Sequence, residues 1–199
     1  TGRRCAASVS IAGTGPTVTD ITSTAFLNTD LAASFAATTW LFVEWGHARK
    51  PHFVGLLTGA VAGLATITPA AGYVPIYASV IIGIAAGAVC YFAVALKNRL
   101  HWDDALDVWG VHGMGGLLGI ILLGVFASTS MNPAGGVGLI HGSGSFFGKQ
   151  VAAGVGCSAY AFAFTWIMLK VIAQITPLRV GEDAEGGRAE AMHGEPAYP

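Results

Sequence analysis

The residues best suited to chemistry are one histidine and a group of carboxylates at the start of a long apolar run. Asp103, Asp104 and Asp107 precede His112, and the apolar segment 117–127 follows shortly after. A neutral imidazole donates a hydrogen bond from one nitrogen and accepts one on the other. Ionisable side chains inside a bilayer are costly, so they usually face a protein interior, a cavity or a transport path. Two roles are therefore open for His112: a hydrogen bond between helices, or a place on a path through the membrane.

The composition is that of a polytopic membrane protein. Of 199 residues, 53% are hydrophobic and only 11% are charged, whereas a soluble domain carries about 25% charged residues. The net charge of -1 provides no basic stripe, which argues against binding to nucleic acid. Glycine is abundant, at 28 residues, as expected where membrane helices pack closely.

The apolar segments predict an all-α membrane bundle of about five transmembrane helices. A span needs about 20 apolar residues, and we place spans at about 24–43, 53–72, 74–96, 105–127 and 146–175. Pro69 is expected to break the last turn of the second span. Residues 24–175 thus form the membrane bundle, residues 176–199 form a polar tail, and residues 1–23 stay unassigned.

Basic residues gather in two of the predicted loops and set the orientation. Arg49 and Lys50 follow the first span, and Lys97 and Arg99 follow the third. The positive-inside rule places both loops in the cytoplasm. With five spans, the tail after Ile175 is then cytoplasmic as well.

Glycines recur every fourth residue in several spans, which favours close contact between helices. The repeats are Gly55, Gly59 and Gly63, then Gly83 and Gly87, then Gly115 and Gly119.

Carboxylates in the first turn of a helix favour its positive end, so we expect Asp104 and Asp107 to stabilise the start of the fourth span.

The sequence does not favour a metal site. The three cysteines, Cys5, Cys90 and Cys157, show no metal-ligand spacing. An intramembrane metal enzyme using His112, His141 and the aspartates would need its ligands clustered on facing helices. His141 lies in a glycine-rich loop on the opposite side from the aspartates. We therefore expect no metal, no cofactor and no enzymatic activity.

Four segments together resemble the ammonium transporter family, the Amt branch of the Amt/Mep/Rh superfamily. Residues 103–116, DDALDVWGVHGMGG, resemble its DD-x-x-DVFGVHG segment, with Trp109 in place of Phe. Residues 59–74 resemble its GAVAGLVAITPAAGYV segment, and 25–45 resemble its AFVNT…EW helix. The tail from Leu178 to Tyr198 resembles its cytoplasmic end, LRV…EE…HGE-x-AY.

This resemblance implies an eleven-helix fold built from two inverted halves, of which the five spans here correspond to the second half. It also implies ammonium or ammonia transport for nitrogen uptake, through one pore per subunit of a homotrimer. The protein would lie in the cell membrane, inner or plasma, with its C-terminus in the cytoplasm. The lipid bilayer and other copies of the chain are then its expected partners.

The resemblance also assigns roles to residues. His112 matches the second member of the family's twin-histidine pair, where ammonium loses its proton in an apolar pore; K+ has no proton to lose. Val108, one turn earlier, would line the pore. Counting back from Phe26, Thr14 keeps the hydroxyl of a serine in the family's sixth helix, so residues 1–23 would be a remnant of that pore-lining helix, while Ser10 replaces its gating aromatic.

The family's first five helices have no counterpart in the chain. They supply the first twin histidine, so the chain as written forms half a pore wall and is expected to be inactive alone. We interpret it as a fragment, a truncated form of a longer protein; the alternative is a degenerate product.

The tail carries two further expectations. Arg179 and the acids after it would contact a neighbouring subunit and a PII-type signal protein, with a solvated tail as the alternative. A different function is also open, namely an ammonium sensor that signals through the tail, although no signalling domain follows Tyr198 in this sequence.

Overall fold

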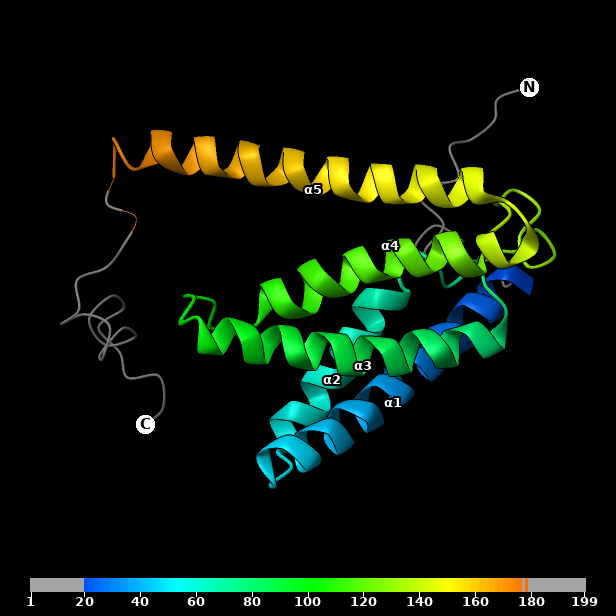
Figure 1. Ribbon diagram of the computed structural model, residues 1–199, viewed down its shortest axis with the longest axis horizontal. Helices are drawn as coiled ribbons and strands as arrows, with labels where there is room; N and C mark the ends of the chain where they lie inside the picture. The colour runs from blue at the N-terminus through cyan, green and yellow to red at the C-terminus, as the bar shows by residue number, and fades with distance from the viewer. Residues whose placement is uncertain (1–19, 177, 179–199) are drawn as a thin grey trace. The chain divides into compact units, whose positions relative to one another are not determined.

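The computed structural model describes residues 20–176 and 178, and the regular elements within them are all helical. The α-helices are α1 (Asp20–Ala48), α2 (Phe53–Ile67), α3 (Ile76–Arg99), α4 (Met114–Phe126) and α5 (Gly144–Ile172) (Figure 1). A π-helical turn, η3 (Trp109–Gly113), runs directly into α4, and a 3-10 turn, η4 (Leu139–His141), precedes α5. The prediction of an all-α membrane bundle of about five helices is confirmed.

Several helix ends differ from the predicted spans. The fourth helix begins at η3 rather than near residue 105, because the backbone at Asp107 has a φ of 55°, which a right-handed helix does not accommodate. The helix α2 ends at Ile67 rather than near residue 72. Pro69, which has no N–H to continue the helix, lies two residues later, as the sequence indicated.

Three segments in the described part of the chain are long and apolar enough to cross a membrane by themselves. They are α3, the continuous η3–α4 segment and α5. The helix α2 is apolar but has only 15 residues. The helix α1 has 29 residues, but it includes Asp20, Asp30 and Glu44 and does not reach the same apolarity.

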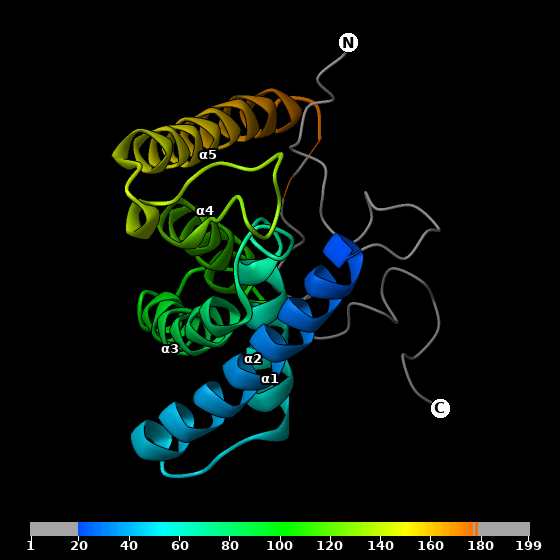
Figure 2. The same cartoon turned by 90° about the vertical axis from the view of Figure 1, so that its right-hand side faces the viewer.

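The helix α1 crosses α2 and lies against α3 (Figure 2). The contacts are made at small residues. On α2, a Cβ at Gly59 would lie 2.5 Å from the Trp40 Cβ. On α3, a Cβ at Gly87 would lie 2.5 Å from the Ala36 carbonyl oxygen. The backbones approach this closely only because these positions carry no side chain, so the contacts expected from the glycine spacing are confirmed.

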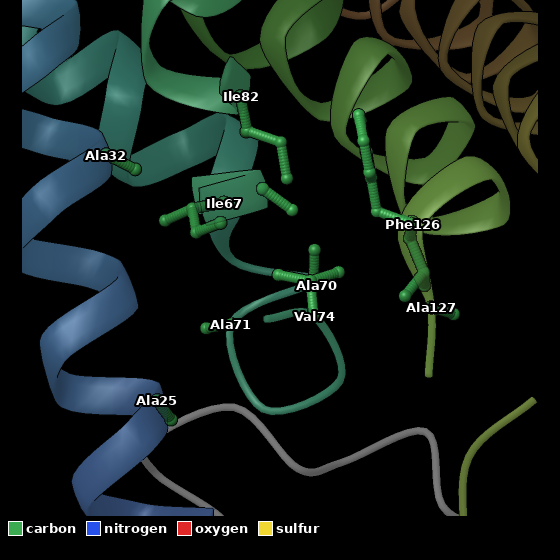
Figure 3. Packing of buried hydrophobic residues seen from close by; sticks show 11 residues of the cluster. Ala25, Ala32, Ile67, Ala70, Ala71, Val74, Ile82, Phe126 and Ala127 are labelled. Carbon is green, nitrogen blue, oxygen red and sulfur yellow. The ribbon is translucent and has the colours of Figure 1, made fainter. Parts of the chain in front are cut away.

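A buried apolar cluster surrounds the turn that joins α2 to α3 (Figure 3). Ile67 and Val74 flank this turn and are fully buried, as is Ile82 of α3. Asn28 of α1, also fully buried, donates from Nδ2 to the Ala71 carbonyl at 2.8 Å and to the Val74 carbonyl at 2.9 Å. The amide thus satisfies two carbonyls of a turn that has no helix to pair them.

The chain divides into two compact units between Val155 and Gly156, and α5 begins in the first and continues into the second. In the second unit, residues 156–172 are exposed along their whole length. Tyr160 stacks on Phe164 with ring centroids 6.0 Å apart, and the Lys170 ammonium lies 5.6 Å from the Trp166 ring centroid. The exposed side chains here are largely apolar, as expected of a segment surrounded by lipid or by other membrane helices.

Candidate functional site

His112 lies in the π-helical turn η3, which holds more residues per turn than an α-helix. The Met114 N–H bonds the Trp109 carbonyl five residues back, where an α-helix pairs residues four apart. Because each residue of an α-helix turns the chain by about 100°, the wider turn changes which side chains face the core. Val111 is buried and the adjacent His112 is exposed. Single π-turns are frequent at functional sites.

Contacts with α2 and α3 fix the inner face of η3 and α4. Gly110 lies against Val94 of α3, where a Cβ at position 110 would be 2.6 Å from Val94 Cγ2. Gly115 lies against Thr66 of α2, where a Cβ would be 2.9 Å from the Thr66 Oγ1. Val111 packs beside Val94 in a buried apolar cluster. The helix therefore cannot rotate freely, and the direction of its outer face is set.

Asp104 holds the start of this helix with both carboxylate oxygens. Its Oδ1 accepts the Val108 N–H at 3.0 Å, and its Oδ2 accepts the Trp109 N–H at 2.9 Å. N–H groups at a helix start have no partner within the helix, and a negative charge there also favours the helix dipole. This is the geometry expected of a carboxylate that begins a helix. Asp103 is exposed and takes no part in it.

Asp107 also lies at the helix start, but it binds Lys97 instead of capping the backbone. Its Oδ1 lies 2.5 Å from the Lys97 Nζ, and the Lys97 side chain is only 6% exposed. The same ammonium donates to the Asp104 carbonyl oxygen at 2.5 Å. A buried lysine thus connects the end of α3 to both aspartates that precede η3.

The outer face of η3 presents His112 and Val108. His112 is exposed and has no hydrogen bond or ion pair with any residue in the described ranges. Val108, four residues earlier, is 51% exposed. Residues four apart in a helix lie on nearly the same face. An apolar side chain and an unpaired imidazole therefore lie together, on the side opposite the contacts that fix the helix.

Other residues singled out in the sequence are not part of this arrangement. Thr14 and Arg179, residues 1–19 and nearly all of the tail lie outside the described residues. Asp30 of α1 is exposed rather than buried. Among the described residues, no three His, Cys, Asp or Glu side chains come close enough to hold a metal ion.

The structure adds two residues that the sequence did not single out, Lys97 and Asn28. Lys97 was assigned to a basic loop, whereas it lies in the last turn of α3 and is buried. The available signal was its spacing, seven residues before Asp104 and ten before Asp107. Asn28 was mentioned only as part of a motif, because the sequence does not show which carbonyls meet its amide.

A match to a protein family identifies the family to which this helical bundle belongs. The model of the Ammonium Transporter Family matches residues 11–198. The chain belongs to the ammonium transporter family. The resemblance stated from the four segments is confirmed, and this ammonium transporter chain is a membrane-embedded protein of a family of transporters, not enzymes.

Two curated ammonium transporters show how much of the family's length is present. The ammonium transporter of Bacillus subtilis is 44% identical over 188 residues, which cover 94% of this chain and 46% of the relative. Ammonium transporter Amt1 of Archaeoglobus fulgidus is 36% identical, with 94% and 47% covered. This chain thus spans about half the length of these relatives.

Solved structures of the family share the fold. The crystal structure of Mep2 from Candida albicans superposes with a TM-score of 0.76 at 40% identity, covering 83% of this chain and 38% of that one. A structure of a sensor Amt protein superposes with a TM-score of 0.74 at 24% identity. The latter likeness shows that the sensor has the same fold.

Proposed function

We propose that this chain forms half of the wall of an ammonium conduction path, with His112 and Val108 facing the path. The observation that supports the proposal is the exposure of an unpaired imidazole on a helix whose opposite face is fixed by Gly110, Val111 and Gly115. A membrane helix exposes an ionisable group at a cost unless a cavity or protein meets it. The remaining part of the family's length would supply the facing wall.

The chemistry follows from a path that holds little water. Such an environment penalises the charged ammonium ion relative to neutral ammonia, so loss of its proton becomes easier there. The neutral imidazole of His112 can accept that proton on one nitrogen while it donates from the other. A second histidine on the facing wall would complete a pair that passes the proton on. A potassium ion carries no proton, so the same path selects against it.

We further propose the family's homotrimer in the cell membrane, with the C-terminus in the cytoplasm and Thr14 at the outer part of the path. Arg49 and Lys50 lie just before α2, and Lys97 and Arg99 lie in the last turn of α3, so both groups of basic residues are at the same end of the bundle. The positive-inside rule puts that end in the cytoplasm. Arg179 and the tail would there meet a neighbouring subunit or a PII-type signal protein.

Because the chain spans about half the length of its relatives, the proposal also concerns what completes the path. If the native protein contains the other half in the same chain, its intact mass is about twice the 20.4 kDa of this sequence, since the two relatives are covered to 46% and 47%. If the native mass equals 20.4 kDa, a single chain holds only half the wall. Transport by one chain would then be contradicted.

The test of the site is His112→Ala in the complete native protein, expressed in cells without their own ammonium transporters. We expect uptake of labelled methylammonium to fall by about 10²-fold, the usual size of a lost proton-transfer group, or K+ to begin to compete. The matched control is His141→Ala, since His141 is exposed on the η4 turn. Unchanged uptake together with unchanged exclusion of K+ would contradict the role of His112.

A further inference from the structure

Lys97 is the described cation least accessible to solvent near η3, and its surroundings differ from those of an ordinary loop lysine. Its side chain is 6% exposed, and its ammonium donates to the Asp104 carbonyl and to Asp107 Oδ1, each at 2.5 Å. Basic residues that only mark the cytoplasmic side keep their charged ends in water. A buried ammonium with two oxygen acceptors has a structural task instead.

The backbone that Lys97 holds is strained. Asp107 has a φ of 55°, in the left-handed region that is sterically unfavourable for a residue with a Cβ. Such conformations persist where the surrounding structure over-determines them, and they cluster at functional sites. The Lys97–Asp107 ion pair supplies one constraint, and the bond from the Asp107 N–H to the Asp104 carbonyl, at 3.3 Å, supplies another.

The strained residue controls where η3 begins. The Asp107 carbonyl accepts the Val111 N–H at 2.9 Å, which is the first helical bond of this segment. The Asp104 carboxylate meanwhile binds the next two N–H groups, those of Val108 and Trp109. Moving the backbone at 104–107 would therefore rotate the turn that follows, and His112 with it.

We propose that Lys97 is a positioning residue for His112. Its ammonium fixes Asp104 and Asp107 relative to α3, and together with the contacts at Gly110 and Gly115 this sets the rotation at which η3 buries Val111 and exposes His112. The effect on conduction rests on the proposed function, whereas the effect on the direction of the imidazole stands on the geometry alone. Both effects can be measured separately.

The structural test uses the complete native protein in lipid nanodiscs and compares Lys97→Met with Lys149→Met. Lys149 is an exposed lysine of α5, so its substitution controls for a lost surface charge. For Lys97→Met we expect shifted ring resonances of His112 and about tenfold faster amide exchange at 108–113, with unchanged exchange in α1. Ring resonances and exchange rates equal to those of the unsubstituted chain would overturn the proposal.

A double variant separates positioning from stability. Lys97→Met alone leaves the Asp107 carboxylate without its partner, whereas Lys97→Met with Asp107→Asn removes both charges. We expect the double variant to regain resistance to unfolding but to keep the shifted His112 resonances. If the resonances return to their original positions in the double variant, Lys97 only balances a charge and the proposal fails. This variant also provides the test if Lys97→Met alone does not fold.

A transport measurement on the complete native protein links the two proposals. We expect Lys97→Met to lower maximal methylammonium uptake about tenfold while the half-saturating concentration stays within about twofold, as for a loss confined to the conduction step. If His112→Ala leaves transport unchanged but Lys97→Met still shifts the His112 resonances, the proposed function fails and the positioning role survives. If the resonances do not move, the positioning role fails, whatever the transport result.

Discussion

Gly119 of α4 lies directly on the Thr66 carbonyl of α2. A Cβ at position 119 would overlap that carbonyl oxygen, which belongs to the backbone and cannot swing aside as a flexible side chain would. In a bilayer, such close contact is a main source of helix association, because lipid tails remove the hydrophobic driving force between helices. The close packing of α4 against α2 therefore depends on the absence of a side chain at residue 119.

Gly119→Ala is expected to lower the free energy of unfolding by about 1–3 kcal/mol, the usual cost of overpacking. The matched control is Gly116→Ala in the same helix, because nothing lies within 4 Å of a Cβ there. Reversible unfolding of both variants in mixed detergent micelles measures the difference. Equal stability of the two variants would show that Gly119 does not pack closely against the Thr66 carbonyl.

Gly110→Ala should move η3 away from α3 and so disturb the site. A Cβ at 110 would meet Val94 Cγ2 at 2.6 Å, whereas a Cβ at Gly113 would meet only Trp109 Cδ1 at an ordinary 3.7 Å. We expect shifted His112 ring resonances and slower methylammonium uptake for Gly110→Ala. Gly113→Ala should leave both unchanged, and its higher helix propensity adds up to about 1 kcal/mol of stability. If the two variants change the His112 resonances and the uptake to the same extent, the contact of Gly110 with Val94 does not fix the orientation of η3.

Asn28→Leu tests the amide that holds the turn between α2 and α3. The substitution leaves the carbonyls of Ala71 and Val74 buried without their donor. Each orphaned group costs about 1–3 kcal/mol, so we expect a loss of about 2–6 kcal/mol in the free energy of unfolding. Thr38→Ala, on the exposed side of α1, should change stability by less than about 0.5 kcal/mol. A loss no larger than that of the control would mean that water or another group replaces the Asn28 amide.

Two residues with nearly identical φ angles should respond in opposite directions to substitution by glycine. His101, with φ 54°, ends α3 with the Trp102 N–H bonded to the Lys97 carbonyl at 3.2 Å, as in a helix C-cap that favours glycine. His101→Gly is expected to add up to about 1 kcal/mol of stability, because glycine has no steric cost there.

Asp107, with φ 55°, also carries strain, but its carboxylate binds the buried Lys97. Asp107→Gly should therefore destabilise the chain by about 3–5 kcal/mol, the usual cost of leaving a buried charge unpaired. Unfolding of both variants under the same conditions measures the contrast. A gain in stability at both positions would show that the ion pair contributes nothing to the strained conformation.

The helices and their contacts could be predicted from sequence because they depend on patterns that run along the chain. Apolar stretches of nearly span length located all five helices, and glycines four residues apart indicated the contacts at Gly59 and Gly87 that the structure contains. The first turn of the fourth helix was placed too early. The carboxylates of Asp104 and Asp107 suit a helix start, but the pattern gives no sign of the positive φ at Asp107.

The site itself was predictable only in part. His112 is a candidate from sequence because an ionisable side chain next to an apolar run is rare, and its place on the path stays a prediction. The π-turn was not, because the sequence WGVHG has no signature that separates it from an α-helix. The spacing of Lys97 from Asp104 and Asp107 allows an ion pair, but only the folded chain shows its ammonium buried against Asp107.

The dual contact of α1 has a consequence for how the chain enters a membrane during synthesis. When α1 leaves the ribosome, it is not apolar enough to span the membrane by itself. Its small residues nevertheless form the surface that Gly63 of α2 and Gly83 of α3 contact. A segment of this kind partitions poorly into lipid alone. We therefore expect the translocon to retain α1 until α2 and α3 have been made, and to release the three as one unit. The order in which the helices enter the membrane would then depend on the contacts between the glycines of α2 and α3 and the alanines of α1, rather than on the hydropathy of each helix.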